Sequence, residues 1–194
     1  MCKWNVLVMI LLSGVLAGYA AATTPLVYEN FNLYTDDGAL YVNWTTGGAG
    51  NPFLTPHLDS AVKYEGAKSM RLDSPLMDYD DVNKVYFLSD ADWGVVVRDA
   101  GTTTDVNAYN VLTAMVRADS GSAIEDCSIE VRDLVYNTVG ISDALEIPHD
   151  GNWYKIIVPL YTTGGDKTTV EQVLVWFDID PNAPAGSQLW VDDI

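Results

Sequence analysis

Six side chains in the C-terminal half of the sequence combine flat rings with directional hydrogen-bonding groups. These candidate ligand-binding residues are Tyr109, Arg117, Glu130, Arg132, Trp176 and Asp178. Indole and phenol rings offer an apolar face, and guanidinium and carboxylate groups form strong hydrogen bonds. This mixture suits recognition of a ligand that has both apolar and hydroxyl-bearing surfaces. It does not by itself define a catalytic site, and no catalytic residue is assigned.

Strands must position these side chains, because their segments alternate with a period of two. In 173–179 every odd position is apolar, so the even positions lie on the opposite face of a half-buried strand. The same alternation divides 109–118 and 127–136 into an apolar face and a face with the candidate residues. If the three strands share one sheet, their outward faces form a single amphipathic surface. Cross-strand ion pairs on a solvated face, with Trp176 covering the sheet, are the open alternative.

Many other short apolar segments are separated by Gly- and Asp-rich turns, and almost no helical period is present. This pattern predicts an all-β fold, a β-sandwich or jelly roll of two antiparallel sheets, in one domain. The predicted strands cover 26–31, 39–44, 54–58, 69–73, 84–89, 94–98, 109–118, 127–136, 154–160, 173–179 and 188–194.

The N-terminus resembles an export signal. Lys3 precedes an apolar run from Val6 to Leu16, and small residues follow at 20–22. The run is shorter than the roughly 20 residues that a membrane-spanning helix needs. We therefore predict a signal peptide at 1–22, with cleavage after Ala20 as the alternative, and a β-jelly-roll domain at 23–194. The protein is expected to be secreted, either extracellular or at the cell surface.

Charge and cysteine content restrict the partners and the sources of stability. The formal net charge of −17 disfavours nucleic acids and anionic membranes, because binding to them depends on neutralising their negative charge. After signal cleavage removes Cys2, Cys127 is the only cysteine, so no internal disulfide can form. Cys127 is in phase with Ile129 and Val131, which predicts a buried apolar role.

Catalytic signatures are weak in this sequence. The run 140–144 lacks the final glycine of a G-x-S-x-G nucleophile motif. The two histidines, His57 and His149, are far apart and show no zinc-binding spacing. A pair of glycosidase carboxylates is not excluded among 27 acidic residues. The sequence thus favours a non-catalytic role over an enzymatic one without deciding between them.

Several short motifs follow one another in a characteristic order. They are 29–31 (ENF), 64–72 (YEGAKSMRL), 107–112 (NAYNVL), 152–155 (NWYK) before 158–160 (VPL), and 189–194 (LWVDDI). This order resembles bacterial carbohydrate-binding modules of the galactose-binding-domain-like β-jelly-roll superfamily. The resemblance implies a secreted, non-catalytic module that binds a polysaccharide. The alternatives are a surface or adhesive module without sugar binding and a glycan-degrading enzyme of the same architecture. Further domains could follow in a longer chain.

The same resemblance implies a structural calcium ion that ties the first strand to the last. Its ligands would be Glu29, backbone carbonyls around Gly66 and Lys68, and Asp192 or Asp193. Calcium takes six to eight oxygen ligands, so a set of this kind is chemically suitable. The acids could equally be ordinary edge-strand or cap residues.

The remaining tryptophans are assigned by their position in the pattern. Trp153 and Trp190 belong to the motifs and are expected to pack internally. Trp44 and Trp93 lie beside predicted turns, where an indole either fills the core or extends a binding surface. The core role is favoured for both.

Overall fold

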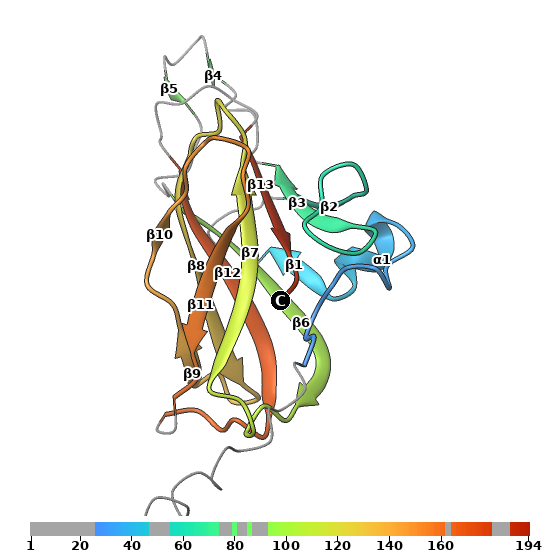
Figure 1. The fold of residues 1–194 in the computed structure, drawn as a ribbon, viewed down its shortest axis with the longest axis vertical. Helices are drawn as coiled ribbons and strands as arrows, with labels where there is room; N and C mark the ends of the chain where they lie inside the picture. The colour runs from blue at the N-terminus through green and yellow to red at the C-terminus, as the bar shows by residue number, and fades with distance from the viewer. Residues whose placement is uncertain are drawn as a thin grey trace, which may run out of the picture.

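The computed structural model describes residues 26–46, 55–73, 79–80, 85–86, 93–161, 164–179 and 187–194. In these ranges two antiparallel sheets pack face to face, as predicted (Figure 1). No helix in the same ranges is long and apolar enough to cross a bilayer. The predicted signal peptide lies outside the described residues.

The larger sheet, sheet A, has the strand order β1-β6-β12-β8-β10, and β9 also pairs with β8. Its strands are β1 (Trp44–Thr46), β6 (Trp93–Thr104), β8 (Ile124–Asp133), β9 (Thr138–Ile141), β10 (Leu145–Glu146) and β12 (Val170–Ile179). The long strand β12 is paired on both sides, with β6 and with β8.

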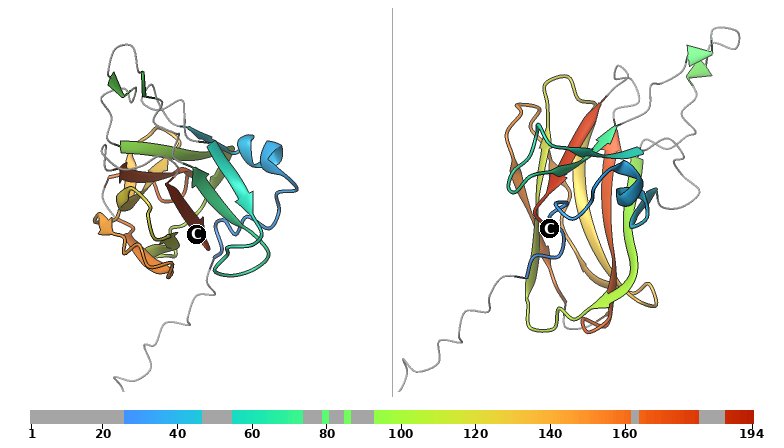
Figure 2. Two further views of the ribbon diagram at one scale, coloured as in Figure 1. Left: turned by 90° about the horizontal axis from the view of Figure 1, so that it is seen from above. Right: turned by 90° about the vertical axis from the view of Figure 1, so that its right-hand side faces the viewer.

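The second sheet, sheet B, has the order β11-β7-β13-β3-β2. Its strands are β2 (Thr55–Asp59), β3 (Ser69–Asp73), β7 (Val111–Ala118), β11 (Tyr154–Pro159) and β13 (Gln188–Asp192). A separate hairpin joins β4 (Tyr79–Asp80) to β5 (Val85–Tyr86). The two views of Figure 2 show the sheets as layers, with the helix α1 (Asp37–Tyr41) beside β2.

The core lies between the sheets and follows the two-residue alternation. From sheet A the inward side chains include Val131, Val175 and Phe177, and from sheet B they include Val116 and Leu189. All five are buried because they lie on the face of their strand that packs against the opposite sheet.

Two buried residues bear on the sequence predictions. Cys127 belongs to the same core and is fully buried, as predicted. Burial raises the pKa of its thiol well above the ordinary value, so the group behaves as a small apolar side chain. Trp44 is also fully buried, with its ring centroid 5.7 Å from that of Phe31, which confirms the core role. The side chain of Trp93 lies outside the described residues.

Two strand predictions near the N-terminus were wrong. Residues 39–41 belong to helix α1, because the Asp36 side chain accepts a hydrogen bond from the backbone N–H of Ala39 and caps the first turn, and of 39–44 only Trp44 lies in a strand, β1. The segment 26–31 forms no strand. Instead the backbone of Glu29 exchanges two hydrogen bonds with that of Ile194, at 2.8 and 2.9 Å, which ties the start of the domain to residue 194.

Candidate functional site

The outward side of sheet A brings together aromatic, apolar and hydrogen-bonding side chains from three adjacent strands. Trp176 lies on the central strand β12, opposite Val95 of β6 and Ser128 of β8. Its neighbours Val175 and Phe177 point into the core, so the indole points outward and is partly exposed. We call this surface the sheet A face. It comprises Val95, Val97 and Asp99 on β6, Asp126, Ser128, Glu130 and Arg132 on β8, and Gln172, Leu174, Trp176 and Asp178 on β12.

Glu130 accepts hydrogen bonds from three other side chains around this face. The Trp176 indole N–H donates to Glu130 Oε2 at 3.2 Å, and the Thr138 hydroxyl donates to Oε1 at 2.7 Å. The Arg132 guanidinium donates to both carboxylate oxygens, at 2.9 and 2.7 Å. The residue is only 6% exposed. The ring of Trp176 is therefore held in place by a carboxylate that is itself fixed by an arginine.

The charge state of Glu130 follows from these contacts. Burial alone would raise the pKa of its carboxyl group, since desolvation disfavours the ionised form. The hydrogen bonds from Arg132, Thr138 and Trp176 and the charge of Arg132 outweigh burial, and the pKa falls below its ordinary value. Glu130 is consequently ionised at neutral pH and forms a closed ion pair with Arg132.

The remainder of the sheet A face contains two buried apolar side chains and further polar groups. Val95 and Leu174 are buried although they do not belong to the core between the sheets. At one end of the face the Gln172 amide donates to Asp99 Oδ2 at 3.1 Å. At the other end Asp178 lies opposite Asp126. A ligand on this face would thus meet the partly exposed indole of Trp176 and the polar groups beside it.

Four of the six predicted ligand-binding residues share this face, and two do not. Glu130, Arg132, Trp176 and Asp178 come together because β8 and β12 are hydrogen-bonded neighbours. The expectation that 109–118 joins the same sheet was wrong: this strand, β7, pairs with β11 and β13 of sheet B. The alternation of side chains determines which face a residue occupies but not which strands are adjacent.

Arg117 consequently lies on the outward side of sheet B. Its guanidinium donates to Asp119 Oδ1 at 2.6 and 3.0 Å and sits over the Trp190 ring, 5.5 Å from the ring centroid. Trp190 is only 3% exposed but lies outside the core cluster. Its indole N–H donates to Asp59 Oδ2 at 2.9 Å. Trp190 is therefore buried as expected, but on the outward side of sheet B and not in the core between the sheets.

The loop between β2 and β3 crosses the outward side of sheet B. The Tyr64 ring on this loop contacts the Trp153 ring beside β11, with centroids 5.9 Å apart. Asp192 on β13 accepts hydrogen bonds from the backbone N–H groups of Tyr64 and Glu65. The loop thus occupies the middle of this sheet, where a ligand would otherwise have access to Trp190.

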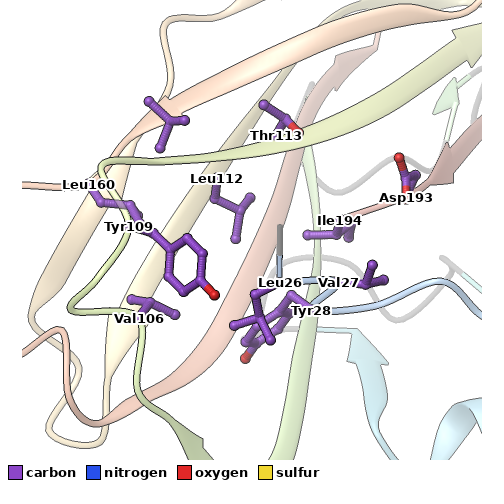
Figure 3. A pocket seen from close by; sticks show the side chains of 11 residues that line it. Leu26, Val27, Tyr28, Val106, Tyr109, Leu112, Thr113, Leu160, Asp193 and Ile194 are labelled. Atoms are coloured by element: carbon purple, nitrogen blue, oxygen red, sulfur yellow. The ribbon is translucent and has the colours of Figure 1, made fainter. Parts of the chain in front are cut away.

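Tyr109 lines an apolar hollow of about 320 Å³ beside the start of β7 (Figure 3). Its backbone carbonyl accepts a hydrogen bond from the Lys167 ammonium group. The other lining residues are Leu26, Val27, Tyr28, Val106, Val111, Leu112, Thr113, Leu160, Asp193 and Ile194. No residue of the sheet A face lines this hollow, so Tyr109 does not extend that surface.

Glu29, the first predicted calcium ligand, is satisfied by protein donors. Its Oε1 accepts from the backbone N–H groups of Asn30 and Phe31, at 3.0 and 2.9 Å. Its Oε2 accepts from the Tyr34 hydroxyl at 2.7 Å and from Arg98 Nε at 3.3 Å. The guanidinium of Arg98 therefore balances the charge of this buried carboxylate.

The other predicted calcium ligands lie in a separate hollow of about 310 Å³. Asp192 and Asp193 line it with Val27, Asn30, Asn32, Glu65 and Gly66. Glu29 instead lines a neighbouring hollow with Arg98. Among the residues that the structure describes, no group of three or more His, Cys, Asp or Glu side chains is arranged to hold a metal ion. The predicted ligands thus line two neighbouring hollows, and calcium binding stays a prediction.

Sequence reasoning missed three residues near the site. Thr138 lies on β9, a strand that was not predicted, and it reaches Glu130. Gln172 and Asp99 extend the face at the ends of predicted strands. Gln172 occupies an even position of β12, as Trp176 does, so the alternation of side chains could have identified it. No local pattern indicated that Thr138 would contact Glu130.

Comparison with known proteins identifies structures with a similar fold. No protein-family model and no curated protein sequence matches the chain. Among solved structures, a family 11 carbohydrate-binding module of the cellulosomal cellulase Lic26A-Cel5E of Clostridium thermocellum superposes with a TM-score of 0.51 at 10% identity, covering 89% of this chain and 94% of that one. A structure of carbohydrate-binding modules from the β-sandwich superfamily gives 0.53 at 16% identity, covering 90% and 63%.

An α-L-arabinofuranosidase is also similar, with a TM-score of 0.53 at 11% identity, but only 24% of its length is covered. At these identities the likeness concerns the fold. The chain therefore has the β-sandwich fold of carbohydrate-binding modules, as the order of its motifs predicted.

Proposed function

We propose that the protein is a secreted, non-catalytic module that binds a polysaccharide on the sheet A face. The observation that carries this proposal is the outward Trp176 ring, fixed by Glu130 among apolar and hydrogen-bonding neighbours. An indole stacks on the apolar side of a pyranose ring, and the surrounding amide and carboxylate groups suit its hydroxyls. Sheet B offers less, because its central tryptophan is buried.

The structural neighbours support polysaccharide binding in general. Two of the similar structures are carbohydrate-binding modules, and the arabinofuranosidase structure holds bound arabinose. Trp176 is partly exposed and Asp178 is exposed on the same strand, so a polymer can reach this part of the face from solvent. The polar groups on the face are already held by one another, so little order has to be gained on binding.

Affinity electrophoresis against a panel of soluble polysaccharides tests the proposal. We expect the wild-type protein to be retarded by at least one glycan and Trp176→Ala to weaken that binding by roughly tenfold or more, since removing a central aromatic residue typically costs over 1.4 kcal/mol. Tyr64→Ala is the matched control, because it removes an exposed ring from the opposite side of the sandwich. It should leave the retardation unchanged.

Other outcomes assign other functions. Absence of retardation by every glycan, with Trp176→Ala behaving as the wild type, would reject sugar binding and favour an adhesive or structural module. Release of reducing sugar from a bound glycan would favour a glycan-degrading enzyme. Melting temperatures of both variants must stay near that of the wild type, so that lost binding is not lost folding.

Export is tested separately. N-terminal sequencing of protein recovered outside the producing cell should start at Thr23, immediately after the predicted cleavage site. An uncleaved N-terminus on membrane-bound material would contradict secretion and favour an anchor.

A further inference from the structure

We propose that Glu130 makes the sheet A face selective for uncharged glycans by masking the one cation on that face. The inference rests on the proposed polysaccharide binding and adds the chemical class of the ligand. An available positive group strongly favours recognition of a uronate or a sulfated sugar, and the contacts of Arg132 decide whether such a group exists on this face.

The outward positions of the described strands of sheet A carry far more negative than positive charge. Arg132 is the single basic residue among them. The acidic residues at outward positions are Asp99, Asp126, Glu130, Glu146 and Asp178. An anionic polymer would therefore approach a surface of its own sign, which disfavours both encounter and binding.

The guanidinium of Arg132 is occupied in the manner in which arginine normally binds an anionic ligand. An arginine recognises a carboxylate or sulfate through two parallel N–H donors. In this structure Nε and one terminal nitrogen donate to the two oxygens of Glu130, at 2.9 and 2.7 Å. The side chain of Arg132 is partly exposed, so an anion from solvent could reach it if Glu130 were absent.

Displacing Glu130 from Arg132 would be costly. The Glu130 side chain is almost completely buried, and it also accepts hydrogen bonds from Trp176 and Thr138. A ligand carboxylate that took over the guanidinium would leave a buried anion without its counter-charge. The ion pair therefore acts against anionic ligands but not against neutral ones.

The substitution Glu130→Gln tests this role because it removes the charge and keeps the shape of the side chain. The amide oxygen can still accept one hydrogen bond from Trp176, Thr138 or Arg132. Arg132 would then carry an uncompensated positive charge on the binding face. Glu146→Gln, on β10 of the same sheet, is the matched control: it removes one negative charge without releasing Arg132.

The ligand is the polysaccharide that retards the wild-type protein, used as a hydroxyethylated and a carboxymethylated derivative of equal substitution. At low ionic strength we expect the wild type to bind the hydroxyethylated polymer at least about fivefold more tightly, as one close like-charge contact in water would give. Glu130→Gln should raise the affinity for the carboxymethylated polymer, relative to that for the hydroxyethylated polymer, by about fivefold or more. Glu146→Gln should produce a much smaller gain.

Equal binding of both derivatives by the wild type overturns the inference while leaving the proposed function intact. Equal gains from Glu130→Gln and Glu146→Gln also overturn it, because net charge alone would then explain the change. Failure to bind any neutral glycan rejects the proposed function and the inference with it. If Glu130→Gln does not fold, the salt dependence of wild-type binding serves instead: raising the ionic strength should strengthen binding of the carboxymethylated polymer toward that of the hydroxyethylated one, and a weakening would show that Arg132 already attracts the anion.

Discussion

Asp192→Asn should destabilise the protein through the loop between β2 and β3. Asp192 is 1% exposed, and its Oδ2 accepts from the backbone N–H groups of Tyr64 and Glu65 at 2.9 and 3.1 Å. Its Oδ1 accepts from the N–H of Asp193 at 2.9 Å. Asparagine keeps one acceptor oxygen but points an N–H donor at the remaining donors. Burial raises the pKa of this carboxyl group despite its hydrogen bonds, so the loss comes from buried donors left without an acceptor; at about 1–3 kcal/mol for each such donor, we expect a loss of about 2–4 kcal/mol.

Thermal and urea denaturation measure this loss. For a domain of this size about 1 kcal/mol corresponds to roughly 2–4 °C, so the melting temperature should fall by roughly 5–15 °C. Asp193→Asn is the matched control on the neighbouring residue. Asp193 has a φ of 49°, a conformation that asparagine accepts readily, and the variant should melt within about 2 °C of the wild type.

The same experiment in a chelator separates two roles for Asp192. If its main role is to accept the loop hydrogen bonds, Asp192→Asn lowers the melting temperature equally with and without chelator. If its main role is to hold calcium, the chelator lowers the wild-type value, because an ion that binds only the folded state stabilises it. The difference between wild type and variant then vanishes in chelator, and that result would refute the hydrogen-bond reasoning.

Three further measurements check other parts of the structure. Gly66→Ala should destabilise the same loop by about 1–2 kcal/mol in urea titration, because φ is +66° and the added Cβ would lie 2.4 Å from Asn32 Nδ2. Burial would raise the pKa of Asp133, but N–H donors such as that of Asp166 outweigh it and lower the pKa. Its stabilisation is therefore complete above the unfolded-state pKa near 4 and declines as pH falls through the lower folded-state value; Asp133→Asn should flatten this loss between about pH 5 and 3. Chelator alone should lower the wild-type melting temperature if calcium is bound, and an unchanged value would reject the predicted calcium.

The sequence by itself determined which face of a strand each side chain occupies. In β12 and β8 the alternation of apolar and polar residues correctly placed Trp176 and Glu130 outward and Cys127 inward. This succeeds because side chains alternate with a period of two along any strand, whatever its neighbours are. The order of turns and strands likewise predicted two packed sheets.

Only the tertiary structure decided which strands lie side by side. It pairs β8 with β12 and moves β7, with Arg117, to the opposite sheet. Pairing depends on contacts between segments far apart in the chain, and an alternating pattern fits equally well in either sheet.

The contacts that define the binding face also join residues far apart in the sequence, so local patterns do not predict them. Thr138, Arg132 and Trp176 converge on Glu130 from three strands, and the β2–β3 loop lies over the sheet that carries Trp190. Local residue patterns place each group on its strand. The network of hydrogen bonds around one buried carboxylate exists only when the sheet has formed, because its members are separated by up to 46 residues.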